Sequence, residues 1–153
     1  MNAVLLKGEE VEVARAEVEA VRAAVGESEY AELLDELLAT LDTGAAVEGR
    51  HSDELDRLLT LALQSGRVRA LYGPGGEQAA LRAYRKLPSG SQLAETTSAV
   101  NEALVSLNGR RIDRLSVTAI GPGAFTISVT TDDGPQLTVR LDRQGTRIAS
   151  VEL

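Results

Sequence analysis

The pattern of the sequence changes near Gly109, and this change constrains the fold more than any other feature. Before Gly109 the apolar residues recur every three or four positions, which is typical of amphipathic helices. After it come four short segments rich in β-branched residues, separated by turn sequences such as 121–123 and 132–135. Short turns between consecutive strands predict an antiparallel meander with one apolar and one polar face. We therefore expect an α+β fold with a mainly helical N-terminal region, followed by a helix and a four-stranded antiparallel β-meander.

The helix over residues 30–41 has the clearest spacing. Its stripe repeats at i, i+3, i+4, i+7, i+8 and i+11 and consists of Tyr30, Leu33, Leu34, Leu37, Leu38 and Leu41. Ser28 is the expected N-cap, and Gly44 closes the helix. Ser52 is expected to cap a third helix whose stripe includes Leu55 and Leu59.

The other helical segments are less regular. Residues 14–25 carry an apolar stripe, and residues 67–72 fit a helical turn or a short strand, of which we favour the turn. Residues 73–76, Gly-Pro-Gly-Gly, predict a break before a helix over 77–87. Residues 88–91 predict a joint, with Ser91 capping a final helix over 92–107.

Two lobes follow from these elements. Residues 1–90 form an acidic helical lobe with a short N-terminal hairpin, since Gly8 suits a turn between residues 3–6 and 11–13. Residues 91–153 form the helix plus antiparallel meander, in which Leu115 and Val117 are expected to face the core and Ile120 to follow a bulge. We expect the two lobes to pack as one compact domain, because 153 residues is about the length of one.

Charge is distributed unevenly along the chain. Residues 1–64 hold fifteen acidic against five basic side chains, whereas residues 65–153 hold eleven basic against eight acidic ones. The net charge of −7 argues against general DNA binding, which needs a basic surface facing the phosphates. Aromatic side chains on which bases could stack are scarce, since the chain has three Tyr, one Phe and no Trp. Nucleic acid is thus a possible partner that we do not favour.

The composition also bears on compartment and chemistry. The chain has no Cys, which excludes disulfides and thiolate metal sites. The early apolar run is too short for a signal peptide, and no stretch approaches the roughly 18 apolar residues of a membrane span. We therefore expect a cytoplasmic protein without membrane contact.

One candidate anion site is the glycine-rich segment that leads into the helix over 77–87. Gly75 and Gly76 could present backbone N–H groups to an anion, and Arg82, Arg85 and Lys86 follow in sequence. The segment lacks the Gly-Lys-Ser/Thr ending of a phosphate-binding loop, and Glu77 would repel an anion. A plain connector is the favoured interpretation.

A second candidate is basic. Arg110, Arg111 and Arg114 open the meander, and three more arginines lie at 140, 143 and 147. Such a cluster could bind an acidic partner or a phosphate, but the commoner explanation is a solvated sheet face whose charges protect the sheet edges from pairing.

Two acidic segments contain the residue types that bind metal ions. Residues 51–56, His-Ser-Asp-Glu-Leu-Asp, are better explained as a helix N-terminus, where carboxylates favour the dipole. Residues 132–134 lack the alternating ligands of a calcium loop and predict a hairpin turn. We predict no metal, no cofactor and no catalytic residue; a small enzyme using Asp113 or Glu102 is the least favoured alternative.

The leading hypothesis is therefore a non-enzymatic protein-interaction or adaptor protein, self-associating as a homodimer or binding another protein. An open meander has two edge strands, here near Val117 and Val151, and free edges accept strands from other chains. An apolar helix face could serve instead. The alternative is binding of an anion or of nucleic-acid phosphates by the arginine-rich second half.

Overall fold

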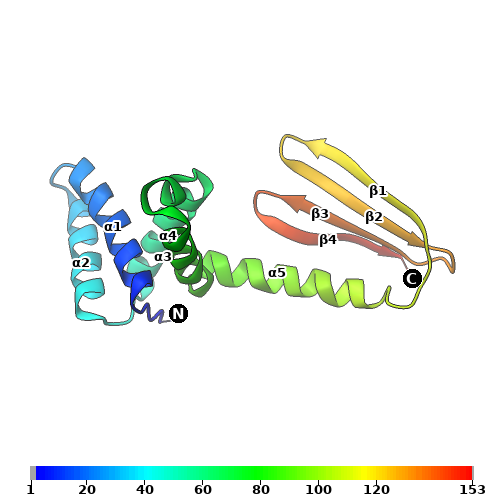
Figure 1. The fold of residues 1–153 in the computed structure, drawn as a ribbon, viewed down its shortest axis with the longest axis horizontal. Coiled ribbons are helices and arrows are strands. Elements are labelled where there is room, and N and C mark those ends of the chain that lie inside the picture. The colour runs from blue at the N-terminus through cyan, green and yellow to red at the C-terminus, as the bar shows by residue number, and fades with distance from the viewer. Residues whose placement is uncertain (1–2, 153) are drawn as a thin grey trace. The chain divides into compact units, whose positions relative to one another are not determined.

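The computed structural model describes residues 3–152. Within this range five helices are followed by a four-stranded antiparallel sheet, which confirms the predicted α+β fold (Figure 1). The chain divides into two compact units, Met1–Ser91 and Gln92–Leu153, which we call the helical unit and the sheet unit. Each unit is described by itself.

Four helices build the helical unit: α1 (Glu9–Ala24), α2 (Glu29–Thr43), α3 (Gly49–Gln64) and α4 (Arg67–Lys86). Helix α1 packs against α2 and α4, and α3 packs against α4. Their apolar stripes meet in a core whose largest fully buried side chains include Leu34, Leu37, Leu55 and Leu59. The predicted leucine spacing of the second and third helices is therefore what fills this core.

The predicted ends of α2 are confirmed. The Ser28 hydroxyl accepts a hydrogen bond from the Ala31 N–H at 3.2 Å, which satisfies one of the free donors of the first turn. Gly44 ends the helix in the left-handed conformation, with φ of 68°, and this conformation favours glycine.

The predicted N-terminal hairpin is wrong. Val4 pairs with Val47, in the loop before α3, through two backbone hydrogen bonds of 2.9 and 2.8 Å. Residues 11–13 belong instead to α1, because Val11 lies three residues before Ala14 and extends the helical stripe toward the N-terminus. The apolar helical stripe thus outweighs the turn preference of Gly8, which serves as the N-cap of α1 rather than as a hairpin turn.

Two predicted caps lie inside helices. Helix α3 begins at Gly49 with Glu48 as N-cap, so Ser52 is a buried helical residue. Helix α5 (Pro88–Val105) begins at Pro88, so residues 88–91 are helical and Ser91 does not cap. Proline favours the first position of a helix, because its missing N–H would have no intrahelical partner there.

The ambiguous residues 67–72 are helical, as favoured, and form the first part of α4. The predicted break is confined to Gly73, whose backbone (φ 68°, ψ −171°) leaves the helical region, while Pro74 starts a second helical segment that continues to Lys86. Gly75 and Gly76 are therefore helical residues.

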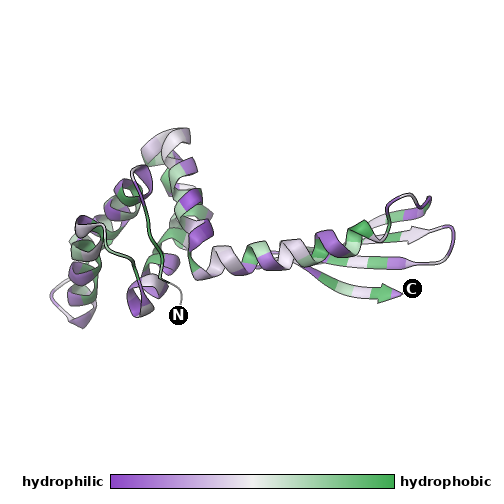
Figure 2. Cartoon of the chain, turned by 90° about the horizontal axis from the view of Figure 1, so that it is seen from below, coloured by the Kyte–Doolittle hydropathy of each residue, from purple (hydrophilic) through white to green (hydrophobic). Residues whose placement is uncertain are grey.

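In the sheet unit, the C-terminal part of α5 precedes four strands: β1 (Ile112–Gly121), β2 (Ala124–Thr131), β3 (Gln136–Asp142) and β4 (Gly145–Glu152). They pair antiparallel in the order β1-β2-β3-β4, which is the predicted meander. Apolar and polar residues alternate along the strands in Figure 2. The alternation puts Leu115, Val129, Leu137 and Val151 in one row across the sheet, and Val117, Ile127, Val139 and Ile148 in the next row.

Helix α5 covers part of this apolar face. Val100 is buried against Leu137 and Val139 of β3, and Ala103 and Leu107 pack beside it. The core of the sheet unit thus sits between α5 and the middle of the sheet.

Candidate functional site

Strand β1 has a neighbour on one side only, since the sheet order places β1 and β4 at the two edges. All ten β1 residues are exposed. An edge strand presents a row of unpaired backbone N–H and C=O groups, which another chain can use for pairing. The predicted edges near Val117 and Val151 are thus the edges of this sheet.

The apolar face is uncovered at both edges of the sheet, and more so at β1. In one row Val151 on β4 is 47% exposed, Leu137 2%, Val129 7% and Leu115 62%. Leu115 and Val117 therefore lie on the apolar face as predicted, but the prediction that they face a core is wrong. The reason is that the apolar stripe of α5 contacts β3, and one helix about 10 Å wide does not cover four strands at about 4.8 Å spacing.

Two register irregularities define the free part of β1. The ladder to β2 shifts between Ile112 and Arg114 and again between Ala119 and Gly121. The sequence predicts a bulge just before Ile120, and the second shift instead makes Ile120 itself the extra residue. The first shift makes Asp113 the extra residue, so that Ile112 pairs with Thr131 and joins the apolar face. Alternation along the sequence alone puts Ile112 on the polar face, because the apolar residues Leu115 and Val117 of the same strand have odd numbers and Ile112 has an even one.

We call four exposed side chains of the apolar face on β1 and the adjoining strand β2 the β1 patch: Ile112, Leu115, Val117 and Phe125. Phe125 belongs to it because it pairs with Ala119 in the same apolar face and is 44% exposed. Fully burying an apolar side chain of this size contributes about 1.5–3 kcal/mol, so covering a half-exposed one contributes about 1 kcal/mol. The four together therefore offer about 4 kcal/mol to whatever covers them.

The opposite face of the sheet is polar and internally paired. Ser128 on β2 and Thr138 on β3 lie within 3.1 Å through their hydroxyls. Asp142 accepts from both Arg140 and Arg147 at 3.0 Å. A backbone hydrogen bond from Gln144, together with the two guanidinium groups, lowers the pKa of Asp142. This face is solvated, as expected for a meander with one apolar side.

The predicted basic cluster at the start of the meander is partly neutralised. Arg110 pairs with Asp133 at 2.7 Å. Arg111 and Arg114 are exposed and form no salt bridge with the residues from 3 to 152. Two arginines therefore remain available to an anionic partner.

Of the three basic α4 residues in the predicted anion site, Arg82 and Lys86 are paired within the chain. Arg82 contacts Glu9 at 2.9 Å, and Lys86 contacts Glu10 at 2.6 Å and the Leu5 carbonyl at 3.2 Å. Glu10 is buried, which raises its pKa, but hydrogen bonds from Lys86 and from the Lys7 N–H outweigh burial and lower it. Arg85 is exposed.

The glycine segment of α4 faces acidic side chains. Gly75 and Gly76 line a cavity of about 350 Å³ together with Glu9 and Glu12. Carboxylates repel an anion, so this surrounding works against the predicted anion site. Gly76 has a packing role instead, since a Cβ there would overlap the Tyr72 side chain.

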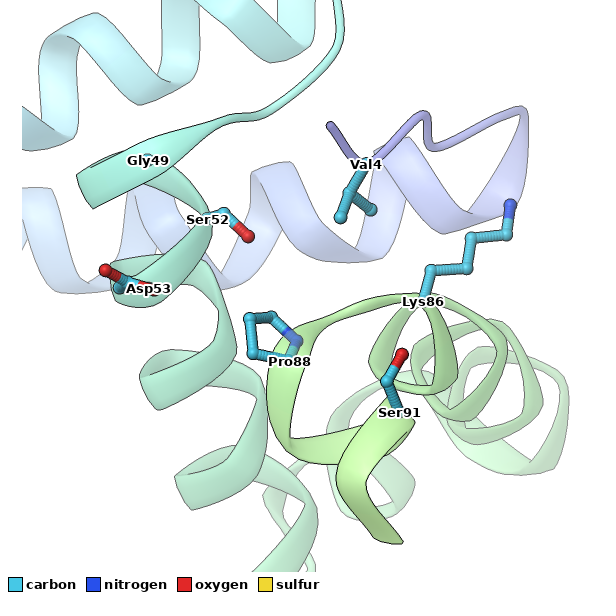
Figure 3. A pocket seen from close by; sticks show the side chains of 7 residues that line it. All are labelled: Val4, Gly49, Ser52, Asp53, Lys86, Pro88 and Ser91. Atoms are coloured by element: carbon cyan, nitrogen blue, oxygen red, sulfur yellow. The ribbon is translucent and has the colours of Figure 1, made fainter. Parts of the chain in front are cut away.

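A second cavity, of about 320 Å³, lies in the helical unit where α3 and α5 begin (Figure 3). Gly49, Ser52 and Asp53 come from α3, Pro88 and Ser91 from α5, and Lys86 and Val4 complete the lining. The Ser52 hydroxyl is buried and has no hydrogen-bond partner in the described part of the chain. The lining thus offers two hydroxyls, a carboxylate and the ammonium group of Lys86, which already contacts Glu10 at 2.6 Å.

His51 and Arg50, at the start of α3, share one carboxylate partner. His51 contacts Glu36 at 2.9 Å, and Arg50 contacts the same carboxylate at 2.8 Å. These two partners lower the pKa of Glu36. Among residues 3–152 no three His, Asp or Glu side chains gather closely enough to hold a metal ion.

In comparisons with known proteins, no family model, no curated protein and no solved structure matches this chain. Within residues 3–152, none of the helices combines the length and the apolar character that crossing a membrane requires.

Proposed function

We propose that this protein is a non-enzymatic interaction protein that self-associates through its sheet unit. The observation that carries the proposal is the β1 patch beside the free β1 edge. A strand whose every residue is exposed, with Leu115 and Val117 more than 60% exposed, is a natural place for a second chain.

The extent of the patch supports this function. Soluble monomers rarely leave contiguous apolar surface of more than a few hundred Å² uncovered, and larger patches mark interaction sites. The β1 patch holds four large apolar side chains that are each at least 44% exposed. An adaptor role in the cytoplasm is part of the same proposal, and it rests on the sequence alone.

The experiment is light scattering behind size exclusion at several protein concentrations, at low and high salt. We expect a dimer that persists in high salt, because burial of apolar surface is insensitive to screening. Leu115→Lys places a charge in the β1 patch and should give a monomer, whereas Ser150→Lys places one on the polar face of β4 and should leave the dimer intact. A wild-type monomer at all concentrations would overturn the proposal.

The alternative function is anion binding by the arginine-rich second half, and it is favoured by the absence of ion pairs at Arg111 and Arg114 within residues 3–152. Arg111→Glu with Arg114→Glu discriminates the two functions. A polyanion that binds the wild type and loses its affinity for the double variant would support the alternative. A salt-resistant dimer without polyanion affinity would support self-association.

A further inference from the structure

The cavity of the helical unit where α3 and α5 begin is independent of the β1 patch and of the proposed function. We call it the serine cavity, since Ser52 and Ser91 both line it. Its volume of about 320 Å³ lies at the lower end of the range of small-molecule sites, roughly 300–1,000 Å³. We infer that the serine cavity binds a small uncharged polyol, whose hydroxyl groups hydrogen-bond to the two serines.

The Ser52 hydroxyl is the group that points to a ligand. Ser52 is only 3% exposed, and its Oγ atom has no hydrogen-bond partner among residues 3–152. In Figure 3 the hydroxyl points into the serine cavity, toward the space that Val4 and Pro88 also face. Nearly all buried polar groups in proteins are hydrogen-bonded, so this hydroxyl needs a partner from outside the chain.

A second hydroxyl comes from another helix. Ser91 is half-buried in the first turn of α5, and Figure 3 shows its hydroxyl pointing back toward the cavity. Serine hydroxyls both donate and accept hydrogen bonds, as the hydroxyls of a polyol do. Two such groups on different helices fix the orientation of a ligand that carries two or more hydroxyls.

Apolar surface accompanies the two hydroxyls. Val4 is buried and is held in place by two backbone hydrogen bonds to Val47, and Pro88 is the first residue of α5. Their side chains contribute C–H groups but no donor or acceptor, which suits the carbon chain of a polyol. A largely apolar wall with a few placed polar groups is the usual composition of a small-molecule site.

The charged residues of the lining favour neither an anion nor a cation. Asp53 and Lys86 are of opposite sign. The Lys86 ammonium group contacts Glu10 at 2.6 Å and the Leu5 carbonyl at 3.2 Å, and in Figure 3 its side chain extends away from Ser52. Asp53 follows Ser52 in the same helix, so the two side chains point in directions about 100° apart. The hydroxyls that face the cavity are therefore its available polar groups, and they are uncharged.

The N-terminus of α5 does not turn the cavity into an anion site. The buried Asp56 carboxylate on α3 accepts hydrogen bonds from the Ser89 N–H at 3.0 Å and from the Ser89 hydroxyl at 2.6 Å. A carboxylate at this position already complements the positive end of the helix dipole. Any added anion is repelled by this negative charge and by that of Asp53.

Titration of the ¹⁵N-labelled full chain with glycerol, xylitol and sorbitol, followed by NMR, tests the inference. We expect at least one polyol to shift the amide signals of Gly49, Ser52 and Ser91 saturably. A dissociation constant of about 1 mM is expected for a ligand of about ten non-hydrogen atoms. Thermal stabilisation is no substitute for this measurement, because polyols stabilise folded proteins by exclusion from their surface.

Two variants and a control locate the binding. Ser52→Ala removes the unpartnered hydroxyl and should weaken polyol binding about three- to tenfold, the contribution of one hydrogen bond. It should not lower the melting temperature, because this hydroxyl makes no hydrogen bond within residues 3–152. Ser91→Leu fills the cavity and should abolish binding. Ser65→Ala, beyond the other end of α3, is the matched control and should leave the affinity unchanged.

Saturable shifts that Ser52→Ala weakens and Ser65→Ala does not would support the inference. Three results would overturn it. They are the absence of saturable shifts with every polyol, equal polyol affinities of the wild type and Ser52→Ala, and tighter binding of inorganic phosphate or methylammonium in the same cavity. A cavity that holds only water gives the first of these results. None of them depends on whether the chain self-associates, so this inference and the proposed function fail separately.

Discussion

Leu115 on β1 lies directly opposite Val129 on β2, yet Leu115 is 62% exposed and Val129 only 7%. The two side chains share one face of the sheet and differ in what covers them. Val129 lies toward the strands under α5, whereas Leu115 lies at the free edge. In our proposal one apolar row therefore performs two tasks: its middle holds the fold of the sheet unit, and its exposed β1 end binds a partner.

Truncation of this row should separate the two tasks. Leu137→Ala removes a side chain that is 2% exposed and packed under Val100, so it should lower the free energy of unfolding by about 2–4 kcal/mol. Leu115→Ala should change it by less than about 0.5 kcal/mol when measured at concentrations below the dimer range. Urea denaturation followed by circular dichroism measures both. An equal loss of stability for the two variants would contradict the uncovered β1 patch.

A second prediction concerns the contact between Lys86 and Glu10 in the helical unit. Lys86→Met leaves the buried Glu10 carboxylate without its counter-ion. Breaking a fully buried pair costs about 3–5 kcal/mol, but Lys86 is 40% exposed and water reaches it, so we expect about 1–2 kcal/mol at neutral pH. Arg82→Met is the matched control: its pair with Glu9 is exposed on both sides and should contribute at most about 1 kcal/mol.

The same pair makes the stability of the helical unit depend on acid. The folded pKa of Glu10 is lowered from its ordinary 4.5, so the ionised form is favoured by folding. The contribution is present above pH 4.5 and is lost as the pH falls through the lower folded pKa. The difference in stability between the wild type and Lys86→Met should therefore shrink below about pH 4. Thermal unfolding between pH 3 and 7 tests this, and a difference that stays constant with pH would assign the loss to packing of the lysine stem instead.

Some elements could be predicted because local and tertiary preferences agree. The leucine spacing of α2, its Ser28 cap and its Gly44 stop all point to the same helix, and the four strands follow from alternation between turn residues. In these segments each residue supports the element that its neighbours favour.

The errors arise where short signals compete. Gly8 fits a hairpin turn, but the stripe that begins at Val11 makes a sixteen-residue helix, and helix formation is cooperative over such a length. Ser52 has the chemistry of a cap, but its position within the buried face of α3 decides its place. The exposure of the β1 patch depends on which strands α5 covers. The spacing of apolar residues within a single strand or helix does not show which strands a helix will cover.

A third prediction uses the two adjacent glycines of α4. A Cβ at Gly76 would overlap the Tyr72 side chain, so Gly76→Ala should lower the free energy of unfolding by about 1–3 kcal/mol. A Cβ at Gly75 meets nothing within 4 Å, so Gly75→Ala should be neutral or stabilise by up to about 1 kcal/mol, because alanine restricts the unfolded chain. Chemical denaturation of both variants checks the difference, and a stabilised Gly76→Ala would show that Tyr72 moves freely.

A fourth prediction concerns Tyr72, whose hydroxyl donates to Glu17 at 2.8 Å while Arg67 holds the other carboxylate oxygen at 3.1 Å. Burial, followed by the contact with the Glu17 carboxylate, raises the pKa of Tyr72 to about 12. Because the folded pKa exceeds the unfolded value of about 10, the contribution to stability is complete below pH 10 and is lost as the pH rises through about 12.

Ultraviolet absorbance reports this titration directly, because the chain has three Tyr and no Trp. The pKa values of Tyr30 and Tyr84 are also raised, both by burial first and then by neighbouring carboxylates. Tyr72→Phe should remove the step near pH 12 and leave the other two tyrosines, and Glu17→Gln should move that step to lower pH because the carboxylate charge is gone. A step near pH 12 that survives in Tyr72→Phe would assign it to another tyrosine and contradict the contact between Tyr72 and Glu17.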